Sequence, residues 1–126
     1  MESEELTKKI IQCAFKVSNT LGSGFLEKVY ENALAHEIRK TGLSAEQQYP
    51  ISVIYDGVVV GEYIADIVVN DIVLVELKVV KEIDNMHKAQ CINYLKATGL
   101  KVCLLINFGQ QKTQVKRITN NFICEA

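Results

Sequence analysis

Residues 58–78 read VVVGEYIADIVVNDIVLVELK, two apolar stretches separated by a short polar break. The β-branched residues in both stretches favour extended strands, and the polar break favours a turn between them. Charged residues interrupt the apolar pattern at Asp66, Glu76 and Lys78. Because burying an unpaired charge in a sheet costs several kcal/mol, something must compensate these three charges.

The spacing of the two acids restricts the turn that joins the strands. Asp66 and Glu76 lie on one face of an antiparallel pair only if the pairing is symmetric about Asp71. A two-residue turn would instead pair Ala65 with Glu76 and send Asp66 to the opposite face. The two acids therefore require a three- or five-residue turn, or a bulge.

Metal binding would compensate the three charges together. Two carboxylates converging on a divalent cation, with the Lys78 ammonium two residues beyond Glu76 on the same strand face, form such an arrangement. The plainer alternative is an ion pair of Glu76 with Lys78 on an exposed strand face.

The rest of the chain predicts helices around these strands. Apolar residues at three- and four-residue steps indicate helices, and Asp56-Gly57 predicts a two-residue hairpin turn. The expected order is ααβββαββ, an α/β fold in which a mixed β-sheet is flanked by helices, within one domain spanning residues 1–126. The expected helices are 5–21, 25–40 and 84–97, and the expected strands are 49–55, 58–69, 72–78, 101–107 and 113–118, the last at a sheet edge.

Composition places the chain among ordinary globular domains. Its 126 residues are 48% hydrophobic and 23% charged. No apolar run approaches the roughly 18 residues of a membrane-spanning helix, and no signal-peptide pattern follows the acidic start. The cysteines are widely spaced among apolar neighbours, as expected for buried, reduced thiols: Cys13, Cys91, Cys103 and Cys124. We therefore expect a cytoplasmic protein without membrane association.

The net charge of −1 conceals an uneven distribution of charge along the chain. Residues 1–77 carry 12 acidic and 6 basic side chains, whereas residues 78–126 carry 3 acidic and 8 basic ones. A basic half beside an acidic half is typical of a phosphate-binding surface next to a carboxylate metal site. Exposed lysines are, however, also the commonest solvated residues.

Five short stretches follow one another along the chain, and together they carry a family resemblance. They are GFLEKVY at 24–30, VGEYIAD at 60–66, VELK at 75–78, QCINYL at 90–95 and LINFG at 105–109. In this order they resemble the GxxExxY protein family, a branch of the PD-(D/E)XK nuclease superfamily. The resemblance implies a restriction-endonuclease-like core and hydrolysis of phosphodiester bonds, with DNA as the expected substrate. RNA as substrate, and endo- or exonucleolytic cleavage, stay open.

The resemblance assigns roles to the residues of the two central strands. Asp66 and Glu76 match the metal-binding acids of the superfamily, and the Leu77 carbonyl would be a further metal ligand. Lys78 matches the lysine that positions or deprotonates the attacking water.

The resemblance also assigns roles to residues on two helices. Glu27 matches an acid on the preceding helix that completes or orients the metal shell. Gln90 and Tyr94, four residues apart on one helical face, resemble the QxxxY motif of RecB-like nucleases, which steadies the water or a phosphate. Ala65 stands where many members have proline.

Cofactor and partners follow from the same residues. Mg²⁺ suits a site with few carboxylates that keeps several waters, and Mn²⁺ should substitute. With only Cys103 and Cys124 in the C-terminal region, no iron–sulfur cluster is expected. A near-neutral chain of this size offers few phosphate contacts, which favours a homodimer or a larger protein partner. The alternative function is a nuclease-fold accessory module that binds nucleic acid or a protein without cleaving.

Three further polar residues receive structural interpretations. Glu31 is expected on a solvated helix face. Tyr30 is expected to pack in the core with a hydrogen-bonded hydroxyl, and His87 to be structural or exposed.

Overall fold

The computed structural model describes residues 3–119, so Cys124 lies outside the described residues. The order of its elements confirms ααβββαββ. No helix within residues 3–119 is long and apolar enough to cross a membrane. The elements are α1 (Ser3–Leu21), α2 (Glu27–Lys40), β1 (Ala45–Tyr55), β2 (Val58–Val69), β3 (Val73–Lys78), α3 (Asn85–Thr98), β4 (Val102–Asn107) and β5 (Gln114–Thr119).

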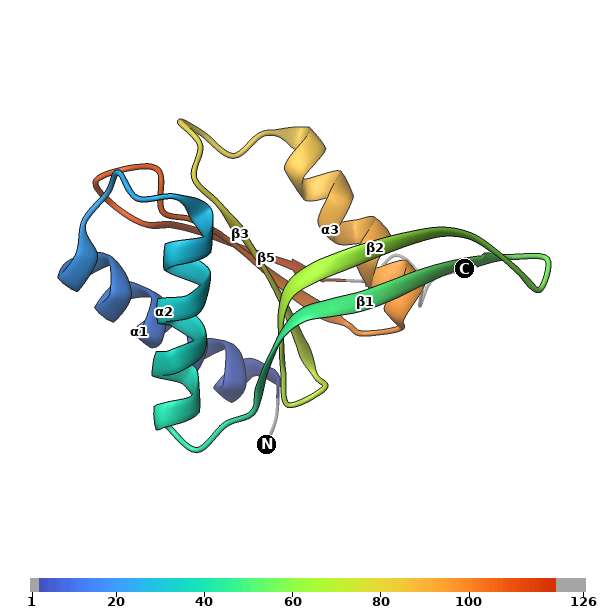
Figure 1. The fold of residues 1–126 in the computed structure, drawn as a ribbon, viewed down its shortest axis with the longest axis horizontal. Helices are drawn as coiled ribbons and strands as arrows, with labels where there is room; N and C mark the ends of the chain where they lie inside the picture. The colour runs from blue at the N-terminus through green and yellow to red at the C-terminus, as the bar shows by residue number, and fades with distance from the viewer. Residues whose placement is uncertain (1–2, 120–126) are drawn as a thin grey trace.

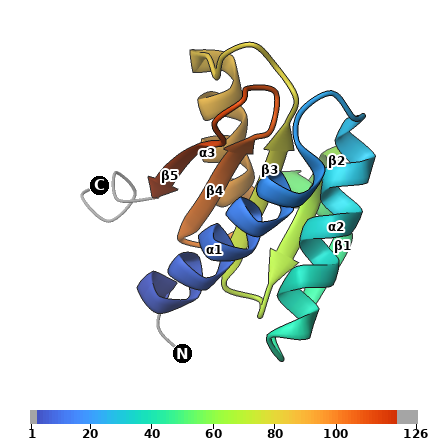
Figure 2. The same ribbon diagram turned by 90° about the vertical axis from the view of Figure 1, so that its left-hand side faces the viewer.

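The five strands form one mixed sheet in the order β1-β2-β3-β4-β5. Neighbouring strands are antiparallel except β3 and β4, which are parallel and are connected through α3. Helices α1 and α2 cover one face of the sheet and α3 covers the other, as Figure 1 and Figure 2 show. The expected α/β fold is thus confirmed, with β5 at an edge.

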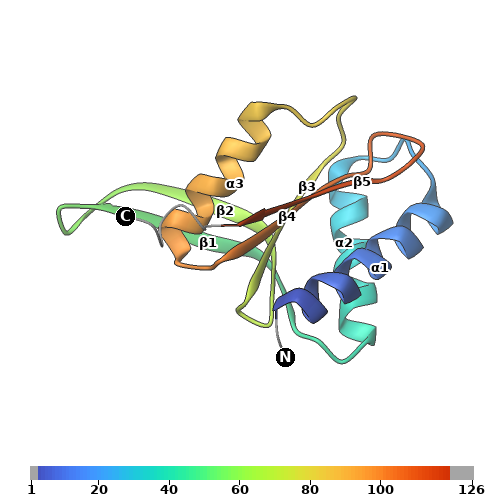
Figure 3. The same cartoon turned by 180° about the vertical axis from the view of Figure 1, so that it is seen from behind.

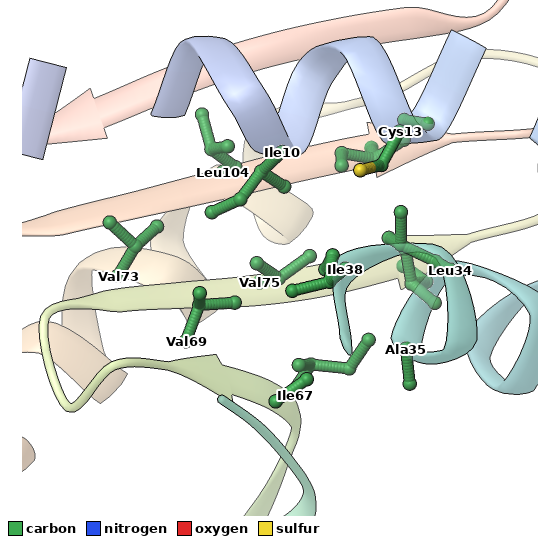
Figure 4. Packing of buried hydrophobic residues seen from close by; sticks show 14 of the residues in the cluster. Ile10, Cys13, Leu34, Ala35, Ile38, Ile67, Val69, Val73, Val75 and Leu104 are labelled. Carbon is green, nitrogen blue, oxygen red and sulfur yellow. The ribbon is translucent and has the colours of Figure 1, made fainter. Parts of the chain in front are cut away.

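The larger core lies between the sheet and the α1–α2 layer. Apolar side chains from both helices meet alternate residues of β2, β3 and β4 there (Figure 4). A second core on the opposite face packs Leu74 of β3 against Cys91 and Leu95 of α3. Because β3 is buried on both faces, it is apolar almost throughout, and Glu76 is its buried exception.

The turn between β2 and β3 has the length that the spacing of the acids required. Val69 pairs with Val73, so three residues form the turn and the pairing is symmetric about Asp71. Asn70 and Asp71 both adopt positive φ angles, 52° and 55°, which these residue types tolerate better than most.

Helix α3 lies within one residue of its expected bounds at each end. Asp84 caps its first turn together with His87, in a reciprocal pair of hydrogen bonds. Gly99 ends the helix in a left-handed conformation with φ of 78°. His87 therefore has a structural role.

Strand β1 begins earlier than expected, at Ala45 rather than Tyr49. The polar sequence at 46–48 concealed this start. Gln48, with φ of 54°, interrupts the ladder, and the register skips the pair that it would form with Asp66. Beyond this point, the β1–β2 hairpin extends past α3 and projects from the body of the protein (Figure 3).

Candidate active site

Strands β2 and β3 separate next to the two acids that interrupt them. Their ladder ends at the pair of Ile67 with Val75, after which β2 pairs only with β1 and β3 only with β4. Asp66 and Glu76 are the next residues in the same register, where the two strands diverge. We call this point, at Asp66 and Glu76, the β2–β3 fork. Glu76 shares the strand parity of Leu74, a residue of the α3-side core, whereas Ala65 and Ile67, on either side of Asp66, belong to opposite cores.

Each acid caps a backbone N–H group of the opposite strand at the fork. The Asp66 N–H donates to Glu76 Oε1 at 2.9 Å, and the Leu77 N–H donates to Asp66 Oδ2 at 2.8 Å. The carboxylates thus replace the carbonyl acceptors that a continued ladder would have supplied. Since the N–H and C=O of a strand residue point to the same side, the Leu77 carbonyl also faces the fork.

Burial makes the charges of both acids costly. The Glu76 residue is only 4% exposed, and burial raises the pKa of its carboxyl from 4.5 to about 8, with a further contribution from the charge of Asp66. Burial also raises the pKa of Asp66, although the hydrogen bond from Leu77 opposes this shift. Full ionisation of the pair at neutral pH therefore requires additional positive charge.

Lys78 supplies part of that positive charge. Its ammonium lowers the pKa values of Asp66 and Glu76, against the stronger effect of burial. Within residues 3–119, Lys78 forms no side-chain hydrogen bond or ion pair. The surface ion pair of Glu76 with Lys78 is therefore not formed, and the ammonium is available to a ligand.

Glu27 approaches the same site from the first turn of α2. Glu27 is an exposed residue, but partial desolvation of its carboxyl raises its pKa, and the charge of Asp66 adds to the shift. Lys78 opposes both effects. The structure therefore brings Glu27 within electrostatic reach of the fork.

Tyr94 of α3 lies within electrostatic reach of the site, and Gln90 contacts Tyr94. Gln90 Nε2 donates to the Tyr94 hydroxyl at 3.1 Å, so the two side chains share one face of the helix, as expected. Burial raises the pKa of Tyr94, and the negative charge of Glu76 raises it further. Within residues 3–119, Gln90 Oε1 is a buried atom without a hydrogen-bond partner.

The sequence matches a known protein family over most of its length. The family model described as the PD-(D/E)XK nuclease superfamily matches residues 4–118. The chain belongs to this superfamily. A search of curated proteins finds no match to this member of the superfamily.

Two solved structures have the same fold as this nuclease-superfamily chain. The crystal structure of SSO0001 aligns with a TM-score of 0.55 at 16% identity, over 73% of this chain and 48% of that one. The chain therefore spans about half the length of SSO0001. An alkaline exonuclease from Laribacter hongkongensis aligns with a TM-score of 0.52 at 14% identity, over 89% of this chain and 79% of that one.

The divalent cation that the superfamily implies fits the residues at the fork. Asp66 and Glu76 each use one oxygen in a backbone hydrogen bond, and the other oxygen has no protein partner within residues 3–119. No group of three or more His, Cys, Asp and Glu side chains in that range is arranged to hold a metal. The available ligands are two carboxylates, the Leu77 carbonyl and water. This all-oxygen set suits Mg²⁺.

The expectation that Glu31 lies on a solvated helix face is wrong. The residue is 3% exposed, and its carboxylate accepts hydrogen bonds from Lys28 at 3.1 Å, Gln47 at 2.6 Å and Gln48 at 2.8 Å. Its negative charge also raises the pKa of Asp66. The available signal was the pair of glutamines, which could be placed over α2 only once the start of β1 was known.

Tyr30 has the packing role that was expected of it. Its ring stacks on Phe108 with the centroids 4.7 Å apart, and its hydroxyl donates to the Gly22 carbonyl at 2.6 Å and accepts from the Phe25 N–H at 3.2 Å. These contacts hold the loop that precedes α2. The tyrosine of GFLEKVY therefore positions Glu27.

The last of the five stretches, LINFG, has a structural role as well. Asn107 is fully buried, and its side-chain amide hydrogen-bonds both the N–H and the carbonyl of Val80. A Cβ at Gly109 would collide with the Val80 backbone. Asn107 and Gly109 thus fix the chain that leaves β3 directly after Lys78.

Proposed function

We propose that this chain is a Mg²⁺-dependent nuclease that hydrolyses phosphodiester bonds in DNA at the β2–β3 fork. The observation that carries the proposal is the reciprocal capping of backbone N–H groups by Asp66 and Glu76. This capping fixes one buried and one partly buried carboxylate at a position where little positive charge compensates them. Such a position favours a divalent cation and, through it, a phosphate.

Each residue at the fork would have its own role in metal binding or catalysis. Asp66, Glu76 and the Leu77 carbonyl would hold Mg²⁺, and Glu27 would orient its water shell. When bound there, Mg²⁺ supplies charge stabilisation to the phosphate and lowers the pKa of a coordinated water. The ammonium of Lys78, unpaired within residues 3–119, would neutralise the surroundings of the attacking water.

The α3 residues would contact the substrate. The Tyr94 hydroxyl, held by Gln90, lies close enough to Glu76 for the carboxylate charge to raise its pKa. A phenolic O–H in this position can donate to a phosphate oxygen and orient it. This role, together with the GFLEKVY stretch, supports a place in the GxxExxY branch with a RecB-like QxxxY motif.

Location and partners form part of the same proposal. Cys13, Cys91 and Cys103 are free and buried, which is compatible with a reducing cytoplasm. A homodimer or a larger protein partner would add phosphate contacts that a chain with net charge −1 lacks.

Hydrolysis assays with matched lysine variants test the function. The substrates are single-stranded DNA, double-stranded DNA and RNA at low salt, with Mg²⁺ or Mn²⁺, since high salt would suppress binding. Lys78→Ala should keep metal affinity and lose cleavage, whereas Glu76→Ala should lose both. Lys101→Ala is the control, because this exposed lysine precedes β4 at the opposite end of the sheet from Lys78.

One outcome would replace the nuclease by the accessory module. This is the case if the protein binds the ion at Asp66 and Glu76, leaves every substrate intact across salt and pH, and is unaffected by Lys78→Ala.

A further inference from the structure

A groove of about 730 Å³ lies between the β1–β2 hairpin and α3. Val53, Ile54 and Tyr63 line it from the hairpin, and Gln90, Asn93 and Tyr94 line it from the helix. The register of the hairpin shifts between Val53 and Ile54. A bulge of this kind bends and twists a strand pair, which shapes this side of the hairpin. The groove has the size of a small-ligand site, about 300–1,000 Å³.

Two tyrosine rings give the groove an aromatic wall. The rings of Tyr63 and Tyr94 are 5.6 Å apart and tilted by 47°. Tyr94 is buried in α3, whereas Tyr63 is 52% exposed and leaves part of its ring open. An open ring beside an apolar groove is a stacking surface for a flat, aromatic ligand.

Gln90, one of the residues that line the groove, carries a polar atom that lacks a partner. Gln90 Oε1 is buried and accepts no hydrogen bond within residues 3–119. A buried acceptor without a partner is costly, so a ligand that brings a donor to it gains affinity. The amino and imino groups of nucleobases are donors on the edge of a flat ring.

The groove and the candidate active site share Tyr94, which lines the groove together with Gln90. Tyr94 is within electrostatic reach of Glu76 and Asp66 at the fork. A ligand in the groove would therefore lie beside the phosphate that those acids hold through their ion.

We propose that this groove binds one unpaired nucleobase next to the scissile phosphate, so that the protein acts on single-stranded or unpaired segments in preference to intact duplex. The proposal rests on the proposed nuclease function and names its substrate class. A paired base is stacked in its helix and would have to leave the stack before it could enter the groove.

Tyr63 and Tyr55 form a matched pair of variants on one hairpin. Tyr55 is 74% exposed at the end of β1 and does not line the groove. Binding of labelled DNA and RNA decamers is measured at low salt by fluorescence anisotropy. Ca²⁺ replaces Mg²⁺ to limit cleavage, and oligonucleotide length is checked after each titration.

The expected result separates the two tyrosines. Loss of base–aromatic stacking in Tyr63→Ala should weaken single-strand binding by about 5- to 150-fold. Tyr63→Phe keeps the ring and should stay within about twofold of the wild type. Tyr55→Ala should leave binding unchanged. A single abasic site moved along the decamer should weaken wild-type binding at one position and have no such effect in Tyr63→Ala.

Other outcomes overturn the base site, the nuclease function or both, and each has a distinct meaning. Equal binding by all variants, or a flat abasic scan, removes the base site while Mg²⁺-dependent cleavage keeps the nuclease function. Tyr63-dependent binding without cleavage in any metal keeps the base site and removes the nuclease. A change in sedimentation of free Tyr63→Ala, with unchanged oligonucleotide affinity, assigns the groove to a second copy of the chain. Absence of oligonucleotide binding overturns both proposals.

Discussion

The paired centre of the β2–β3 ladder and the fork beside it differ in almost every property, although they are adjacent residue pairs. In the paired centre, from Ile67–Val75 to Val69–Val73, backbone groups bond across the strands and all side chains are buried and apolar. At the fork, Asp66 and Glu76 use their carboxylates in place of backbone acceptors. The paired ladder thus positions the two acids. Because the ladder ends beside them, their negative charges are only partly compensated.

The largest expected effect is on activity at the fork. Glu76→Gln removes the negative charge that would hold Mg²⁺, so cleavage should fall by about 10³-fold or more. The same variant should bind Mg²⁺ weakly in calorimetry. Asp66→Asn, which changes the other carboxylate, should reproduce both losses. A Glu76→Gln protein with full activity would show that the chemistry lies elsewhere.

Leu74 lies two residues before Glu76 on the same strand face, and a change there is expected to affect stability. Leu74 is fully buried in the core that faces α3. Leu74→Ala leaves a cavity and should lower the free energy of unfolding by about 2–5 kcal/mol. Denaturant titration measures this loss. At a temperature where the variant is folded, cleavage per folded molecule should stay near the wild-type value, which Glu76→Gln cannot match.

The fork should also make metal-free stability depend on pH. The pKa of Glu76 is raised from 4.5 in the unfolded chain to about 8 in the folded protein. The folded state therefore binds the proton more tightly, and stability is lost as pH rises from about 5 to 9, by up to a few kcal/mol. Thermal unfolding in chelator should show this loss, and Glu76→Gln should flatten it.

The same thermal unfolding measurement, repeated with Mg²⁺, tests the metal site. The melting temperature of Asp66→Asn in chelator should be slightly above that of the wild type, because repulsion with Glu76 is relieved. Mg²⁺ should stabilise the wild type and have little effect on Asp66→Asn. Equal Mg²⁺ stabilisation of both proteins would place the ion at another site.

The last expected effect concerns Glu31 of α2, whose negative charge acts on Asp66. Glu31→Gln weakens the charge-assisted hydrogen bonds from Lys28, Gln47 and Gln48, and should cost about 1–3 kcal/mol of stability. Glu46→Gln, at an exposed position on β1, is the control and should leave the unfolding midpoint unchanged. Equal effects of the two variants would contradict a structural role for the buried network.

Local sequence patterns were sufficient where a periodicity or a symmetry restricts the structure. The element order followed from apolar periodicity, and the spacing of Asp66 and Glu76 required a turn symmetric about Asp71, which the pairing of Val69 with Val73 confirms. The sequence likewise indicated that Tyr30 packs with a bonded hydroxyl. Each of these features depends on neighbours close in the chain or on one strand pair.

Only the tertiary structure decided the features that join distant segments. The burial of Glu31 depends on glutamines of β1, and the groove depends on how the hairpin lies against α3. The reciprocal capping at the fork arises because β2 leaves β3 at the residue pair where the acids stand. Sequence spacing specifies which residues can face each other across a strand pair. It does not specify where that pair ends or which side chains then satisfy the released backbone groups, because competing contacts throughout the sheet determine both.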